Sequence, residues 1–187
     1  MSTLKYLICG ILVMHLGSLS VASEGEEIMI DNFESNSDVR WDYFSDQVMG
    51  GVSEGSASFG SDNGEAYAHM TGDVSTANNG GFIQLRTKLA SGVDKNAQGI
   101  YIKVRGNGQK YYIHLRTRGT MLPWQYYQAG LDVTEDWRII RLPLENFKPS
   151  GSWLRKAAVP TSIRSIGIVA YGRNHQADIQ ISEIGFY

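Results

Sequence analysis

The feature that most constrains this chain is a repeated alternation of apolar and polar residues in short runs, with turn residues between the runs. In one run Ile100, Ile102 and Val104 alternate with Tyr101, Lys103 and Arg105. A period of two places the apolar residues on one face of a β-strand. About ten such runs follow at the short, regular spacing of a sandwich or barrel. The pattern predicts an all-β chain folded as an antiparallel β-sandwich.

The alternation gives a specific set of expected strands. They are Ile28–Phe33, Arg40–Phe44, Ser56–Phe59, Glu65–Gly72, Gly81–Leu89, Gly99–Val104, Lys110–Arg118, Tyr126–Leu131, Trp137–Leu142, Ile163–Tyr171 and Ala177–Tyr187. Two Gly-containing turns, Asn63-Gly64 and Gly106-Asn107-Gly108, predict hairpins between the strands that flank them. No segment is convincingly helical, although Trp153–Ala158 could form a single turn. We expect the last strand to pair near the first, as in jelly-roll sandwiches.

The N-terminal segment has the three parts of a secretory signal peptide. Lys5 precedes an apolar run from Leu7 to Leu19, and small residues follow up to Ser23. We therefore expect residues 1–23 to be removed and the protein to be exported, periplasmic or secreted, with no membrane span after cleavage. An uncleaved N-terminal anchor is the alternative. Residues 24–187 are then expected to form one domain.

Composition excludes several classes of function. The formal net charge of −2 gives no basic field for phosphates, so we expect no nucleic-acid partner. Cys9 is the one cysteine and lies in the signal region, which excludes a disulfide framework and a Cys-ligated zinc in the mature domain. The histidines have no metal-ligand spacing, and no nucleophile motif is present. We expect no catalytic residue, no metal and no cofactor.

The second face of several predicted strands is rich in arginine, aromatic and amide residues rather than in lysine and glutamate. Such a face is a candidate recognition surface. The short run Pro123–Gln128, with three aromatics and two amides, also suits a sugar ring, although the same rings could fill the core. The candidate binding residues are Arg86, Arg116, His114, Tyr112, Gln84, Trp124, Tyr126 and Gln128.

The most distinctive segment is Trp41–Ser53, which ends in Val-Met-Gly-Gly-Val-Ser. Gly50 and Gly51 permit backbone torsions that other residues avoid. Asp46 and Ser53 can hydrogen-bond neighbouring amides and so fix the loop. The segment is either a structural loop at one end of the sandwich or a binding loop in which Met49 is an adaptable apolar contact.

Together these motifs resemble the complex I intermediate-associated protein 30 family. The resemblance rests on Ser45–Ser53, Asn79–Phe82 with Arg86, Val104–Gly108, Leu142–Phe147 and Ser165–Ile168, in this order, and it covers roughly Ile28–Tyr187. It implies a galactose-binding-like jelly-roll fold without catalysis. Eukaryotic members are chaperones of respiratory complex I assembly.

Two functions follow from the resemblance and the residues. One is a non-enzymatic protein-binding or assembly-factor module, whose partner is an assembly intermediate or a membrane complex. The alternative is a module that binds a carbohydrate or another small ligand, supported by the aromatic and basic strand face.

Overall fold

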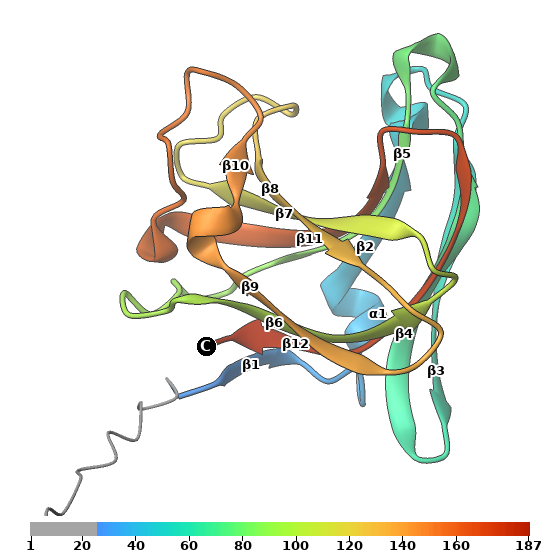
Figure 1. The fold of residues 1–187 in the computed structure, drawn as a ribbon, viewed down its shortest axis with the longest axis horizontal. Helices are drawn as coiled ribbons and strands as arrows, with labels where there is room; N and C mark the ends of the chain where they lie inside the picture. The colour runs from blue at the N-terminus through green and yellow to red at the C-terminus, as the bar shows by residue number, and fades with distance from the viewer. Residues whose placement is uncertain (1–25) are drawn as a thin grey trace, which may run out of the picture.

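The structure is a computed structural model that describes residues 26–187. The expected signal peptide of residues 1–23, with Cys9, lies outside the described residues. The described chain folds into two antiparallel sheets of six strands each (Figure 1). The expected all-β sandwich is therefore confirmed. Within residues 26–187, no helix is both long and apolar enough to span a membrane.

Sheet A contains the two strands nearest the chain ends. Its strand order is β3-β4-β12-β6-β9, and β1 pairs with the remaining part of β12. The strands are β1 (Ile28–Asp31), β3 (Glu54–Asp62), β4 (Glu65–Val74), β6 (Gly99–Gly106), β9 (Arg138–Pro143) and β12 (His175–Phe186). The β1–β12 pairing confirms the expectation that the last strand lies beside the first.

Sheet B has the order β10-β8-β7-β11-β5-β2. Its strands are β2 (Trp41–Ser45), β5 (Phe82–Lys88), β7 (Lys110–Thr117), β8 (Tyr127–Asp132), β10 (Lys148–Pro149) and β11 (Ile163–Tyr171). The helical segments are all short: α1 (Ser37–Arg40), η1 (Asp46–Met49), η2 (Ala77–Asn79), η3 (Leu144–Asn146) and η4 (Pro160–Ser162).

The core lies between the sheets and is built from the apolar half of each alternating strand. Ile100, Ile102, Ile113 and Leu115 are fully buried there. Complete burial of such a side chain stabilises the fold by about 1.5–3 kcal/mol. The opposite residues of each strand then have to lie on the outer face of their sheet, which positions the residues discussed below.

One expected hairpin is present and the other is not. Asn63 and Gly64 have φ of 51° and 84° and join β3 to β4, as a two-residue hairpin turn requires. The predicted hairpin at Gly106-Asn107-Gly108 is wrong, because β6 lies in sheet A and β7 in sheet B. The edges of β6 pair with β12 and β9, so this turn carries the chain from one sheet to the other.

Short elements account for the remaining differences between the elements expected from the sequence and those in the structure. Alternation does not reveal the two-residue strand β10 or the four-residue helix α1. Segment Trp153–Ala158, considered as a helical turn, has no helix and consists of turns, bends and irregular chain.

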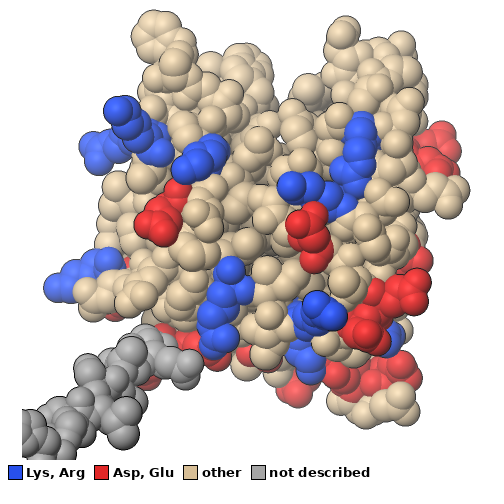
Figure 2. Space-filling view, in the orientation of Figure 1, with Lys and Arg blue, Asp and Glu red and all other residues tan. Residues whose placement is uncertain are grey.

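Two raised parts with a notch between them form the top of the molecule in the view of Figure 2. Their tips carry no charged residues in this view. In Figure 1, drawn in the same orientation, β7 and β11 run beneath the notch, and the start of β5 lies in one of the raised parts. The outer face of sheet B is thus bordered by loops.

Candidate functional site

Antiparallel register aligns six residues across the outer face of sheet B, one from each strand. We call this set the central row. In sheet order it consists of Asp42, Arg86, Gly167, His114, Gln128 and Lys148. Since neighbouring strands are about 4.8 Å apart, the row is about 24 Å long.

Three polar atoms in the central row are buried without a hydrogen-bond partner among the described residues. They are Nε of Arg86, Nε2 of His114 and Oε1 of Gln128. Buried polar groups in folded proteins are nearly always satisfied, because an unmade hydrogen bond costs about 1–3 kcal/mol. Three of the six such atoms among the described residues lie in this row, which makes the row the candidate binding surface.

Gly167 provides space in the middle of the row, between Arg86 and His114. A Cβ atom placed on it would lie 1.8 Å from Nε2 of Gln84. The Gln84 side chain therefore lies across the backbone of β11, where any residue other than glycine would displace it. Gly167 thus allows the side-chain amide of Gln84 to lie next to the Arg86 guanidinium and the His114 imidazole.

Aromatic rings surround His114. The Tyr126 ring stacks on the imidazole with a centroid distance of 4.0 Å and an interplanar angle of 9°. Tyr171 meets the imidazole edge-on at 5.6 Å and also lies 6.0 Å from Tyr112. The edge-on contacts of Tyr171 are favourable because the positive edge of one ring faces the negative face of another.

His114 is 7% exposed although it points to the outer face. Burial lowers the pKa of His114 to about 4, because the charged imidazolium would lose its hydration. The neighbouring Gln128 amide acts in the opposite direction, but its Oε1 and the imidazole Nε2 do not meet in a well-formed hydrogen bond. At neutral pH the ring is therefore uncharged, with one nitrogen a donor and the other an acceptor. It can hydrogen-bond a hydroxyl group without adding charge to the face.

Two arginines lie on the same face. The Arg86 guanidinium carbon is 4.6 Å from the centre of the Phe44 ring, within cation–π range. The Arg116 guanidinium donates to the backbone carbonyls of Thr120 and Leu122 at 3.2 and 3.0 Å. Burial lowers the pKa of Arg116, and the positive charge of Arg86 lowers it further.

The structure brings together seven of the eight residues that the sequence indicates as binding candidates. They are Arg86, Arg116, His114, Tyr112, Gln84, Tyr126 and Gln128. Strands β7 and β8 are neighbours, whereas β11 separates β5 from β7. Trp124 is not one of the rings around His114 and lies in the β7–β8 connection, 63% exposed. Whether these residues bind a ligand stays a prediction.

The residues of this face that were not predicted from the sequence include Asp42 and Lys148 of the central row, and also Phe44, Gly167 and Tyr171. Phe44 and Tyr171 lie in predicted strands, and their position in the alternation was the available signal. Gly167 gave no signal by itself, because its role depends on the strand order that places it between Arg86 and His114.

In the Trp41–Ser53 segment, strand β2 is followed by η1 and a loop that one buried carboxylate fixes. Asp46 is fully buried. It accepts hydrogen bonds from the backbone amide and the hydroxyl of Ser53 at 2.9 and 2.6 Å, and from the amides of Gly81 and Phe82. Burial alone would raise the pKa of Asp46, but these hydrogen bonds outweigh it and hold the pKa below its usual value.

The two glycines of this loop have different roles. Gly50 has φ of 87° and ends η1 in the left-handed conformation with open space around it. A Cβ on Gly51 would lie 2.3 Å from Cγ of Asp46, so this glycine lets the backbone approach the carboxylate. Met49 points to solvent and is 60% exposed.

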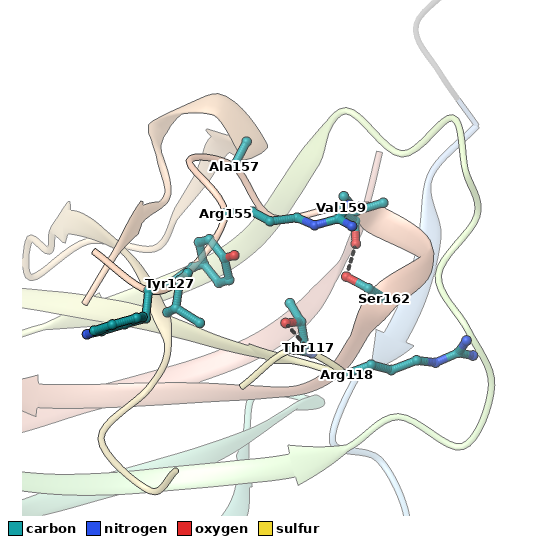
Figure 3. A pocket seen from close by; sticks show the side chains of 10 residues that line it. Thr117, Arg118, Tyr127, Arg155, Ala157, Val159 and Ser162 are labelled. Atoms are coloured by element: carbon teal, nitrogen blue, oxygen red, sulfur yellow. Dashed lines mark hydrogen bonds between the residues drawn. The ribbon is translucent and has the colours of Figure 1, made fainter. Parts of the chain in front are cut away.

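A pocket of about 430 Å³ lies at one end of sheet B (Figure 3). In Figure 3 Tyr127 and Thr117 point toward the pocket, and Arg118 points away. The hydroxyl of Ser162 donates a hydrogen bond to the Val159 carbonyl at 2.6 Å. The backbone amide of Thr117 donates to the hydroxyl oxygen of Thr120 at 3.0 Å. Because these polar groups already have partners, the pocket is a weaker candidate than the central row. Among residues 26–187, no group of His, Cys, Asp and Glu side chains is arranged to hold a metal ion.

The family model of complex I intermediate-associated protein 30 matches residues 31–182. A comparison with curated protein sequences gave no match.

Solved carbohydrate-binding structures have the same fold. One of them is a family 11 carbohydrate-binding module from Clostridium thermocellum, solved in complex with a β-1,3-1,4-mixed-linked tetrasaccharide. It has a TM-score of 0.69 and 16% sequence identity, and the match covers 86% of this chain and 94% of the module's chain. A family 30 carbohydrate-binding module has a TM-score of 0.54 at 11% identity, covering 73% of this chain and 91% of its own. At these identities the likeness shows a shared jelly-roll fold.

Proposed function

The chain belongs to the complex I intermediate-associated protein 30 family. We propose that it is a non-enzymatic binding domain and that its ligand is a carbohydrate, which binds to the outer face of sheet B. The observation that carries the proposal is the central row, with its three buried polar atoms that lack partners in the described chain. Sugar hydroxyls both donate and accept hydrogen bonds, so one chain of sugars supplies partners to an imidazole, an amide and a guanidinium.

The rings beside the row support a sugar more than a flat polar ligand. A pyranose has an apolar C–H face that packs on an aromatic ring and an edge of hydroxyls that needs hydrogen bonds. The stacked pair of Tyr126 and His114 lies directly beside Gln128. Similar folds in solved carbohydrate-binding modules make this use of the sandwich reasonable.

The test is binding of a panel of soluble tetrasaccharides, measured by calorimetry, to wild type and two tyrosine variants. Tyr126→Ala removes the stacked ring of sheet B. Tyr67→Ala is the matched control, because Tyr67 lies edge-on against His69 on the outer face of sheet A. We expect Tyr126→Ala to weaken binding at least tenfold and Tyr67→Ala to leave it unchanged. The proposal fails if no oligosaccharide binds, or if both variants lose binding equally.

A protein partner is the second candidate, favoured by exposed apolar side chains in the loops that border the face. Val48 and Met49 are 70% and 60% exposed, and Met121 and Trp124 are 85% and 63% exposed. Such residues are typical of the centre of an interface with another protein. The partner would be an assembly intermediate or a membrane complex, in agreement with the family to which the chain belongs.

Variants distinguish the two candidates. Met49→Asp and Met121→Asp place charge at these exposed positions and would abolish association with a purified protein partner, because a buried charge without a counter-charge is costly. Both variants would leave oligosaccharide binding unchanged. The reverse pattern, in which Tyr126→Ala alone weakens protein association, contradicts the loop interface.

We also propose that the protein is exported after removal of residues 1–23. The apolar segment closed by small residues supports this. N-terminal sequencing of native protein is expected to begin near Ser23 or Glu24. Native protein that retains Met1 or Ser2 in the cytoplasm would contradict export.

A further inference from the structure

Arg86 lies in the central row with its charge incompletely compensated. Its guanidinium is stacked on the Phe44 ring, and its buried Nε has no partner in the described part of the chain. Asp42 stands opposite Arg86 in the register but is exposed and forms no ion pair with it. Arg86 is half-buried, so part of its guanidinium loses hydration without gaining a counter-charge, which is unfavourable.

An arginine in a similar setting on sheet A has the partners that Arg86 lacks. The Arg105 guanidinium lies 4.8 Å from the centre of the Trp137 ring, again within cation–π range. Its Nε donates to Oε1 of Gln180 at 2.6 Å, and Asp62 forms an ion pair with it at 3.6 Å. The chain thus neutralises a stacked arginine on one outer face and not on the other.

Arg116 adds a second positive charge close to the first. None of the ion pairs among residues 26–187 includes Arg86 or Arg116. The hydrogen bonds of Arg116 go to neutral carbonyls, which fix its position without neutralising it. The effect of Arg86 on the pKa of Arg116 reflects this mutual repulsion. The face therefore has a local positive potential within aromatic surroundings.

Resting on the proposed carbohydrate function, we infer that the ligand is an acidic glycan whose sugar units carry carboxylates, and that Arg86 and Arg116 bind carboxylates of this glycan. A guanidinium presents N–H groups in a planar fork that matches the two oxygens of a carboxylate. A neutral sugar would satisfy the hydrogen bonds of the row and leave both charges uncompensated.

The surroundings favour a sugar as the carrier of the carboxylate. Neutral planar groups lie on the β11 side of Arg86, along or beside the row: the amides of Gln84 and Gln128 and the imidazole of His114, whereas Asp42 is its neighbour on the other side. These groups suit hydroxyls, and the rings of Tyr126 and Phe44 suit sugar faces. The row is long enough for several sugar units in a line, at about 24 Å.

Matched ligands and matched variants test this inference. The ligands are tetramers of galacturonate and of mannuronate, each compared with its own methyl ester, which removes the charge of each carboxyl group and adds one methyl group. Calorimetry would compare them on wild type, Arg86→Gln, Arg116→Gln and Arg138→Gln. Arg138 is an exposed residue of β9 on sheet A and serves as the control. Melting temperatures establish that each variant is folded.

We expect at least one acidic tetramer to bind wild type tenfold or more tightly than its methyl ester. Arg86→Gln is expected to remove most of this ratio, Arg116→Gln part of it, and Arg138→Gln none. The preference should also decrease between 50 and 500 mM NaCl, because salt screens the exposed part of the interaction.

The contradicting results separate the inference from the proposed function. Equal binding of acid and ester, or of neutral tetrasaccharides alone, would overturn the acidic ligand and leave carbohydrate binding in place. Binding of none of these sugars would overturn both. Binding of tetraglutamate in place of any uronate would identify an acidic peptide as the ligand and contradict the inference.

Discussion

The loop around Asp46 and the central row of sheet B both bury polar side chains, and they differ in where the partners come from. Ser53, Gly81 and Phe82 supply all four donors that the Asp46 carboxylate accepts from. In the row, polar atoms of Arg86, His114 and Gln128 have no such partners among residues 26–187. The loop is complete within the chain, and the row is not.

This difference separates a structural motif from a recognition surface. The most distinctive sequence motif of the chain lies in the loop, where its carboxylate and glycines fix the backbone. The candidate ligand contacts come from less distinctive strands that the fold aligns in register. Changes in the loop should therefore affect stability first, and changes in the row should affect binding first.

The largest effect on stability is expected for Asp46→Ala. The substitution leaves the buried amides of Ser53, Gly81 and Phe82 without an acceptor, which should lower the free energy of unfolding by about 3–5 kcal/mol. Urea denaturation of the variant against wild type measures this loss. A loss below about 1 kcal/mol would mean that the carboxylate does not hold the loop.

We expect acid to lower the free energy of unfolding through His114 of the row and Asp46 of the loop in separate pH ranges. His114 is neutral in the folded protein down to pH about 4, whereas in the unfolded chain it takes up a proton below the ordinary histidine pKa of 6.5. Stability is therefore complete above pH 6.5 and falls as pH decreases from 6.5 to about 4, by about 2–3 kcal/mol between pH 7 and 4.5.

The Asp46 contribution behaves differently, since its pKa is lowered from 3.8 and its stabilisation is lost only as pH falls below that value. Urea denaturation at pH 7 and 4.5 is expected to show a larger loss in wild type than in His114→Gln, which retains the contribution of His175, whose pKa is also lowered by burial. An equal loss in both proteins would mean that His114 is not the group that titrates.

The next effect distinguishes the two glycines of the loop. Gly51→Ala should cost about 2–3 kcal/mol, because its Cβ would overlap the Asp46 carboxylate. Gly50→Ala should cost about 1 kcal/mol, because only its positive φ opposes a side chain. Thermal denaturation of both variants tests the order. A larger effect at Gly50 would contradict the close approach at Gly51.

The smallest effect on stability is expected in the row. Arg86→Ala and Arg116→Ala should change the free energy of unfolding by less than about 1 kcal/mol, because these side chains make no ion pair in the described chain. Each should weaken ligand binding by about 1–3 kcal/mol. Large destabilisation without any change in binding would identify both arginines as structural.

Alternation in the sequence predicted the strands and their faces well, because burial on one side of a sheet requires a period of two. Tyr112, His114 and Arg116 were placed on one face in this way, and Gln84 and Arg86 on another strand. Strand order was beyond that reasoning, since it depends on which edges meet in three dimensions. The same limit explains the error at Gly106–Gly108, where two alternating strands on either side of a Gly turn belong to different sheets.

The most direct test of the central claim is a titration of isotope-labelled protein with the tightest-binding oligosaccharide, followed through backbone amide shifts in NMR spectra. We expect the largest shifts in β5, β7, β8 and β11, with the amide of Gly167 among them, and no change in the amides that donate to Asp46. Shifts confined to the Asp46 loop or to the outer face of sheet A would contradict it.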